Sequence, residues 1–213
     1  LLGSYRQLNI DGRIEAHGGT ITLSTDAAGG GYAPLPGIVT NGAAYAAGGK
    51  SVWLGAAADL DVSGVLLEDP LLAPVRIEGV ERMPRSGVAL DGGSVVISSD
   101  TGHVVALGCM DAGSCEDPSA PGARIDVSGT AGTFDLTSGS GAVLAPQAVW
   151  SDAGQIVVGA AAGLHFRATL VAQGGAPEAR GGTLVVAPLA PRIGTSSGFT
   201  GARGLSVLAQ TPD

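Results

Sequence analysis

The sequence is poor in the residues that nucleic-acid-binding, membrane-spanning or disordered proteins need. Lysine and arginine total 11 against 19 aspartate and glutamate, which gives a net charge of −8. This balance argues against nucleic acid or anionic lipid as a partner, because both require basic patches. No apolar run approaches the roughly 20 residues that cross a bilayer, so we expect no membrane insertion. Apolar residues make up 45% and charged residues only 14%, which argues against disorder.

Convincing helical periodicity is missing almost everywhere. The alanine runs at 56–58 and 160–162 are short and flanked by glycine, which predicts turns between strands. Glycine itself is abundant, with 36 residues in 213, far above the usual share of about 7%. Many of these glycines belong to two short phrases that alternate along the chain.

The first phrase is a Gly-Gly pair, or a near-equivalent, followed by alternating apolar residues. Such alternation predicts a short strand with one apolar face, and glycine is suited to the sharp corner that precedes it. Copies begin at Gly18, Gly48, Gly92, Ala153 and Gly181.

The second phrase reads apolar-x-apolar-x-Gly, as in Leu60–Gly64 and Ile125–Gly129, with weaker copies at 14–18 and 170–174. A strand this short buries too little surface to fold alone, but it can stack on the equivalent strand one coil earlier. The sequence therefore predicts an all-β coil of strands, with about nine coils of roughly 20–25 residues. Eight apolar side chains are expected to face inward and be buried: Val95, Ile97, Ile125, Val127, Ile156, Val158, Leu184 and Val186.

Turn-rich, irregular stretches near 26–46, 65–90 and 108–122 interrupt the repeat. We expect them to be insertions at one face of a single solenoid segment that covers residues 1–213. The chain begins mid-pattern without Met or signal peptide, and neither end looks like a cap. We therefore expect a segment of a larger protein, with both ends continuing into further coils and open to end-to-end self-association.

The phrases resemble the repeat region of filamentous-haemagglutinin-like exoproteins of bacterial two-partner secretion. The resemblance rests on the Gly-Gly-Thr/Ser strands, on Ala123–Gly129 and on Ala153–Val158; autotransporter passengers use similar repeats. It implies a right-handed parallel β-helix, export through an outer-membrane β-barrel transporter, and a secreted or cell-surface filament or adhesin. The amino-terminal secretion domain typical of the family is not evident, so the chain resembles the shaft.

Cys109 and Cys115 are the only cysteines, six residues apart around Gly113. We expect them to form a disulfide in an oxidising compartment, with two free thiols as the alternative. A zinc site would need at least two further ligands.

A glycan-acting lyase or hydrolase on the same fold is the main enzymatic alternative. Asp59, Asp61 and Asp126 occupy outward strand positions or their flanks, so a carboxylate cluster is conceivable. Both Asp61 and Asp126 nevertheless lie in repeat phrases, where a short polar residue is typical, and no Lys or Arg completes a site by its spacing. We predict no catalytic residue and no cofactor.

Metal and triad candidates are weaker. Acidic residues cluster at Glu68–Asp69 and at 111–117, but no Gly-Gly leads into the nonapeptide calcium pattern, so we predict no metal site. A catalytic triad with His17, His103 or His165 would need a nucleophilic serine on a Gly-x-Ser-x-Gly elbow that leads into a helix, and the sequence has none. We expect the three histidines to face solvent.

Trp53 is the position most suited to binding. It lies between Val52 and Leu54, so it turns outward where they turn inward. With Tyr32 and Tyr45 it could form a carbohydrate platform; alternatively, the loop that carries these tyrosines covers it.

These observations favour an extended, non-enzymatic rod of an adhesin or filament, which attaches to a glycan or protein on a host or neighbouring cell. Two alternatives remain open. An outward carboxylate cluster in a groove would favour the glycan-acting enzyme, and uncapped terminal coils would favour a structural subunit that polymerises end to end.

Overall fold

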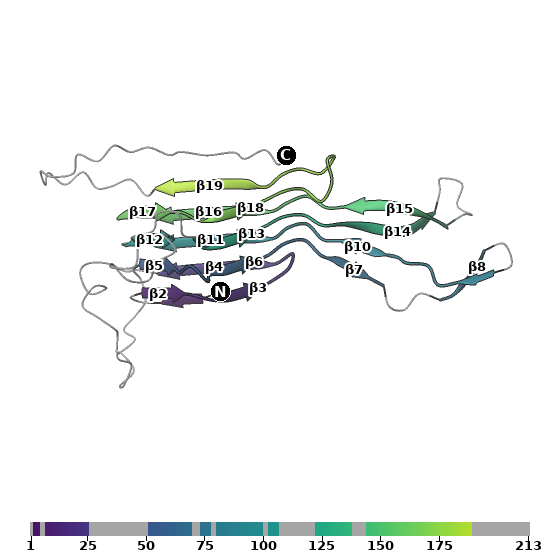
Figure 1. Ribbon diagram of the computed structural model, residues 1–213, viewed down its shortest axis with the longest axis horizontal. Coiled ribbons are helices and arrows are strands. Elements are labelled where there is room, and N and C mark those ends of the chain that lie inside the picture. Colours follow the sequence, from purple (N-terminus) through teal and green to yellow (C-terminus); the bar gives the residue numbers. More distant parts are fainter. Residues whose placement is uncertain are drawn as a thin grey trace, which may run out of the picture.

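A computed structural model describes residues 2–4, 7–25, 51–69, 73–77, 80–99, 102–106, 122–137 and 144–188. The described residues contain strands, turns and bends but no helix. Most strands belong to three parallel sheets, and the rest form antiparallel pairs that project from one side (Figure 1). The prediction of an all-β chain with parallel sheets is confirmed.

Sheet A has five strands in the order β1-β4-β11-β16-β19, and every neighbouring pair is parallel. Its strands are β1 (Leu2–Ser4), β4 (Thr20–Thr25), β11 (Ser94–Ser99), β16 (Gln155–Ala160) and β19 (Thr183–Pro188).

Sheets B and C have four parallel strands each. Sheet B contains β2 (Gln7–Ile10), β5 (Ser51–Leu54), β12 (His103–Ala106) and β17 (Gly163–Phe166). Sheet C contains β3 (Arg13–Glu15), β6 (Asp59–Asp61), β13 (Arg124–Asp126) and β18 (Thr169–Val171).

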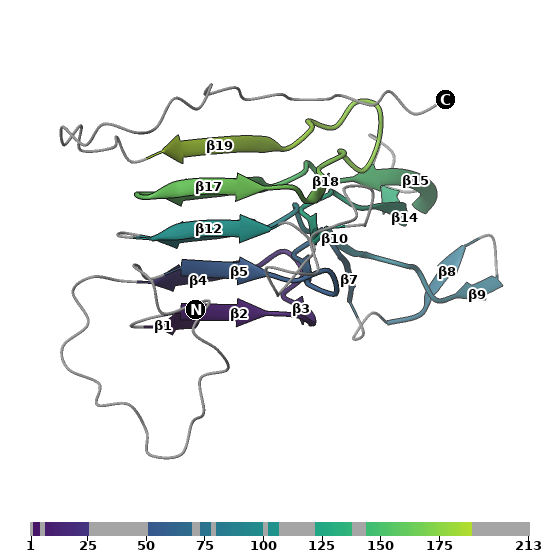
Figure 2. The same cartoon turned by 60° about the vertical axis from the view of Figure 1, so that its left-hand side comes forward.

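The chain visits the three sheets in a fixed order. From β2 it passes to β3 and β4, and the sequence B, C, A then recurs from β5, from β12 and from β17. Each recurrence, here called a circuit, adds one strand to one edge of every sheet, so the strands lie above one another in chain order (Figure 2). The described residues hold four circuits, whereas the predicted nine counted the whole chain at roughly 20–25 residues each. Excursions from the sheets make the second and third circuits longer than that.

The register aligns equivalent phrases. Ile14, Leu60, Ile125 and Leu170 share one position across sheet C, so the second phrase does stack on its own copies. One copy of the first phrase behaves differently. Ser51–Leu54 lies in sheet B beside Gln7–Ile10 and His103–Ala106, not with the other Gly-Gly strands in sheet A. A preceding Gly-Gly pair therefore does not determine which sheet a strand joins.

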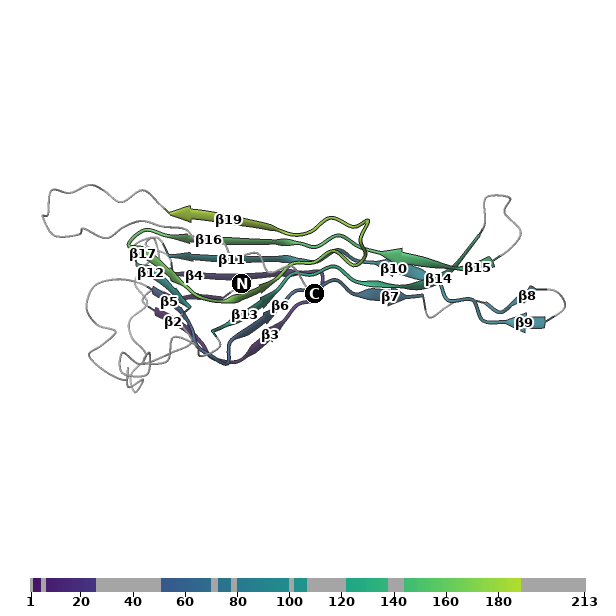
Figure 3. The ribbon, with the colours of Figure 1, turned by 45° about the horizontal axis from the view of Figure 1, so that its top comes forward.

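The tilted view in Figure 3 shows sheets A, B and C arranged around a common interior. The core lies there and joins inward side chains from all three sheets. Six of the eight residues predicted to be inward are buried: Val95, Ile97, Ile125, Val127, Ile156 and Val158. Leu184 and Val186 are not, since Leu184 is 41% exposed and Val186 half-buried. Both lie on β19, the strand at the edge of sheet A, which among the described strands pairs only with β16. Inward side chains of the inner circuits are packed between circuits on both sides, whereas those of β19 have a described circuit on one side.

Close backbone approach explains the glycines at the start of the sheet A strands. A β-carbon on Gly154 would stand 1.7 Å from the carbonyl oxygen of Gly93, and one on Gly93 would stand 1.9 Å from that of Gly19. Any larger residue would push neighbouring circuits apart. Gly18 adopts a φ of 63°, a conformation that glycine tolerates best.

The excursion that follows sheet C in the second circuit contains β7 (Leu66–Glu68), β8 (Val75–Ile77), β9 (Val80–Arg82) and β10 (Gly87–Ala89). Pairs β7–β10 and β8–β9 are antiparallel. This lies within 65–90, where an insertion was expected. A second hairpin, which the sequence did not predict, joins β14 (Ala131–Thr137) to β15 (Leu144–Trp150).

The two excursions pack against each other as one arm. Asp135 donates its backbone N–H to the carbonyl of Arg85 at 2.6 Å, and the Asp135 carboxylate accepts the Arg85 N–H at 2.7 Å. Phe134 is buried with its ring close to Gly87. The other face of the arm leaves apolar groups in solvent, among them Leu67 and Val88, which are directly opposite each other.

Candidate functional site

The richest group of charged side chains lies on the outer face of sheet C. Three of its strands begin with Arg13, Asp59 and Arg124, which share one register position. Two residues later Glu15, Asp61 and Asp126 share the next outward position. Because side chains two residues apart lie on the same face of a strand, the six groups form two adjacent rows. We call these six residues the ion-pair ladder.

Arginine and carboxylate alternate across the first row. Arg13 Nε lies 3.3 Å from Asp59 Oδ2, and Arg124 Nη1 lies 3.2 Å from Asp59 Oδ1. Asp59 therefore bridges two arginines that lie on the strands above and below it. Each pair links neighbouring circuits, so the row favours the register that the parallel pairing of sheet C sets.

The second row is tied to the first by the same arginines. Arg13 contacts Glu15 Oε1 at 2.7 Å and Asp61 Oδ2 at 3.0 Å, while Arg124 contacts the Asp126 carboxylate. The hydrogen bond to Asp61 is the largest cause of the raised pKa of Arg13. For Arg124 burial is the largest single effect and lowers the pKa, but the hydrogen bonds and charges of Asp126 and Asp59 together outweigh it, so the pKa is raised.

Asp61 and Asp126 are almost completely buried, at 6% and 7% exposure, although they are on an outward face. Each accepts two hydrogen bonds at Oδ1 from the serine two residues later: from N–H and Oγ of Ser63 at 3.0 and 2.7 Å, and from those of Ser128 at 2.8 and 2.6 Å. Burial acts to raise the pKa of Asp61, but the Ser63 bonds, Arg13 and His17 outweigh it and hold the pKa below its usual value.

The ladder therefore brings together the three aspartates that sequence reasoning singled out, but as partners of arginine. No Lys or Arg was expected to complete a site by its spacing in the sequence; it is register that places Arg13 and Arg124 beside Asp59, which lies 46 and 65 positions away. Aligning the phrases that begin at Arg13, Asp59 and Arg124 would have revealed the alternation. With every one of these carboxylates engaged by arginine or serine, the ladder serves cohesion between circuits better than acid–base chemistry.

Glu15, His17 and Asp61 offer ligand atoms that all lie within 4.8 Å of one another. His17 Nδ1 is 3.2 Å from Ser63 Oγ and 3.6 Å from Asp61 Oδ1. Because Arg13 binds both carboxylates, this group fits an ion-pair network better than a metal centre.

Trp53 is half-buried on the outer side of sheet B, as its alternation with Val52 and Leu54 predicts. Its register neighbours are Asn9 and Val105. Tyr32 and Tyr45 lie outside the described residues, as do the proposed disulfide partners Cys109 and Cys115 and the acidic cluster at 111–117. The carbohydrate platform and the disulfide therefore stay predictions. In the other acidic pair, Glu68 binds Arg85 and the Asp69 N–H bonds the Ser86 carbonyl.

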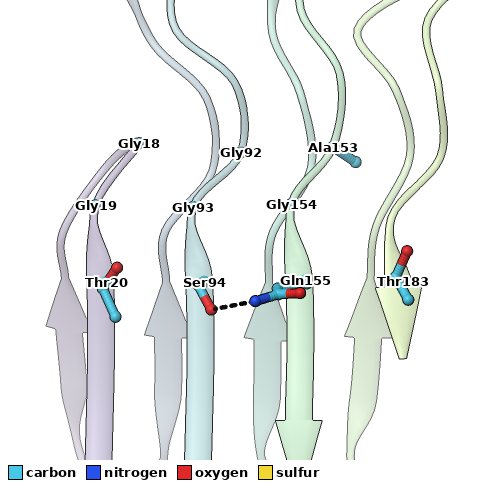
Figure 4. Close-up of a pocket in the computed structure, with 10 residues that line it drawn as sticks. All are labelled: Gly18, Gly19, Thr20, Gly92, Gly93, Ser94, Ala153, Gly154, Gln155 and Thr183. Atoms are coloured by element: carbon cyan, nitrogen blue, oxygen red, sulfur yellow. Dashed lines mark hydrogen bonds between the residues drawn. The ribbon is translucent and has the colours of Figure 1, made fainter. Parts of the chain in front are cut away.

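A shallow open groove of about 420 Å³ crosses the starts of the sheet A strands. Figure 4 shows Thr20, Ser94, Gln155 and Thr183 on four successive strands, with Ser94 Oγ accepting a hydrogen bond from Gln155 Nε2 at 3.3 Å. Glycines and Ala153 complete its lining. Among the described residues that line the groove, none carries a carboxylate, an imidazole or a cation, the side chains that most often act as a general acid or base.

His103 and His165 meet on the outer face of sheet B, with ring centroids 5.7 Å apart. Burial, followed by the neighbouring His165, lowers the pKa of His103. No motif pairs these residues, which are 62 positions apart in the chain.

Comparisons with models of protein families, with curated proteins and with solved structures found no match to this chain. Within the described residues, no helix is both long and apolar enough to cross a membrane.

Proposed function

We propose that this chain is the shaft of a secreted or cell-surface adhesin or filament, built as a right-handed parallel β-helix whose three faces are sheets A, B and C. The observation that carries the proposal is the repeated B, C, A order of parallel strands around one apolar core. Parallel strands joined by such crossovers are almost always connected with a right-handed path. Stacking of this kind produces length, which is what a shaft requires.

The side arm fits the same role. It leaves the sheets between circuits without interrupting their register, so it can present a surface sideways while the stack continues. By resemblance to two-partner secretion exoproteins, the partners would be an outer-membrane β-barrel transporter during export and a cell-surface glycan or protein afterwards.

The glycan-acting enzyme is less well supported. The aspartates that would have to act are held by Arg13, Arg124 and two serines, and the groove on sheet A lies elsewhere. End-to-end assembly has one observation in its favour: Leu184 and Val185 of β19 are 41% and 42% exposed. An apolar strand edge of this kind can pair with another strand.

Three measurements test the proposal together. Antibodies raised against the purified chain should stain intact cells of the organism that encodes it, and in-frame deletion of the region coding for residues 2–188 should reduce attachment of those cells to surfaces. The purified chain, incubated with a panel of acidic and neutral polysaccharides, should release no reducing ends or unsaturated sugars. Staining only after lysis, or polysaccharide cleavage, would overturn the proposal.

A binding variant adds a sharper comparison. If the predicted platform is the attachment surface, Trp53→Ala should lower the binding of the chain to a glycan array. Trp150→Ala, which changes an exposed tryptophan on the arm, is the matched control and should leave that binding unchanged. Equal losses in both variants would place attachment elsewhere.

A further inference from the structure

His103 and His165 lie on the same outer face of neighbouring strands β12 and β17. In register, His103 is beside Gly163, and His165 is beside Val105, two residues further along. The two rings are therefore diagonal neighbours, with centroids 5.7 Å apart and planes inclined by 31°.

Both imidazoles converge over Gly163. The point at which a β-carbon of Gly163 would stand is 3.4 Å from His103 Nε2 and 3.6 Å from His165 Nε2. Because residue 163 has no side chain, this space is left to the two nitrogens. Among the residues that the structure describes, none donates to or accepts from either ring in a hydrogen bond. His103 is half-buried and His165 exposed.

We propose that His103 and His165 together bind a divalent transition-metal ion such as Zn²⁺ above Gly163, and that the ion links the third circuit to the fourth. Imidazole nitrogen is a preferred ligand of Zn²⁺, Cu²⁺ and Ni²⁺. Zn–N bonds are about 2.0–2.1 Å long, so modest side-chain rotations, easiest for the exposed His165, bring both nitrogens to one ion. Water completes the coordination.

The surroundings of the two histidines favour binding. Both strands are held in register by the parallel pairing of sheet B, so the backbone positions of the two ligands are fixed before the ion arrives. An ion that binds only the folded stack stabilises it by mass action.

The third histidine provides a matched control. His17 lies in the turn after β3, beside Glu15 and Asp61, where Arg13 competes with any cation. Zinc is titrated by calorimetry at neutral pH into the wild-type chain and its variants, after both cysteines have been alkylated. This experiment distinguishes binding at His103 and His165 from binding at His17. We expect one bound Zn²⁺, at least about tenfold weaker binding in His103→Ala and in His165→Ala, and unchanged binding in His17→Ala.

Gly163→Ala tests the geometry without removing a ligand. Its β-carbon would occupy the space between the nitrogens and stand 3.0 Å from His103 Cδ2, so zinc binding should weaken as in the histidine variants. Zinc should also raise the melting temperature of the wild-type chain but not that of His165→Ala, whose exposed position tolerates the change. Absence of zinc binding by the wild-type chain, or its loss in His17→Ala alone, would overturn the proposal.

Discussion

Asp61 and Asp126 occupy the same register position on β6 and β13, and each is held by the serine two residues further along. Two carboxylates side by side on neighbouring strands repel each other. Arg13 binds the free oxygen of Asp61, and Arg124 that of Asp126. The Asp-Val-Ser-Gly repeat is therefore a structural corner whose negative charge is neutralised by arginine from the row beside it.

The first prediction concerns acid. Because the folded chain holds the pKa of Asp61 below its usual value, the ionised carboxylate stabilises the fold at neutral pH. This contribution is present above the unfolded pKa of about 3.9 and is lost as the pH falls through the lower folded pKa. Asp61→Asn should cost about 1–2 kcal/mol at pH 7. Denaturant unfolding at pH 7 and below pH 3 should show the difference shrinking; a constant difference would contradict the assignment.

The second prediction extends the ladder by one strand. Thr169 shares the register position of Arg13, Asp59 and Arg124 on the next strand of sheet C. Thr169→Asp should continue the alternation beside Arg124, whereas Thr169→Lys should place like charges together. We expect the aspartate variant to be more stable by about 0.2–1 kcal/mol at low salt, with the gap closing in 1 M salt. Equal stability at low salt would show that charge in the first row does not favour this register.

The third prediction tests the close approach of neighbouring circuits. Gly154→Ala would place a β-carbon 1.7 Å from the carbonyl oxygen of Gly93, while Gly12→Ala meets no atom within 4 Å. The first change should destabilise the fold by about 1–3 kcal/mol or more through overpacking, and the second should have little effect. Thermal unfolding of both variants checks this, and similar melting temperatures would mean that the circuits are not packed as described.

The fourth prediction separates covered from uncovered inward positions. Ile125→Asp puts a charge into a fully buried site and should cost several kcal/mol. Leu184→Asp makes the same change on β19, where the side chain is 41% exposed, and should cost far less. Leu184→Asp should also reduce any concentration-dependent association in sedimentation experiments, since it charges an apolar strand edge. Equal destabilisation by both changes would contradict the exposed position of β19.

Local patterns in the sequence were enough to predict the strands and most of the core. Alternation places Ile125 and Val127 inward because successive side chains of a strand point to opposite faces, and both are buried. The corner glycines were also predictable, because the chain must bend sharply between short strands and glycine allows such bends.

The rest depends on register, which no single phrase contains. Arg13, Asp59 and Arg124 meet because their strands stack, and His103 meets His165 for the same reason. The β14–β15 hairpin has no Gly-Gly start. The Ser-Gly pairs between its strands mark a turn, but the connection is longer than the two-residue turns that identify a hairpin locally, so the pairing could not be predicted. Leu184 faces inward, as its alternation predicts, yet it is exposed. An inward side chain is buried only where the strands of a neighbouring circuit cover it.

The central claim is that segments far apart in the chain stack as parallel strands in this register, and cysteine cross-linking tests it most directly. Thr20 and Ser94 are register partners, whereas Gln155 lies one strand beyond Ser94. Neighbouring strands are about 4.8 Å apart, and disulfides need Cα atoms within about 7 Å. With Cys109 and Cys115 replaced by serine, the Thr20→Cys, Ser94→Cys pair should cross-link within one chain, and the Thr20→Cys, Gln155→Cys pair should not. Equal cross-linking of both pairs, or none in the first, would contradict the account.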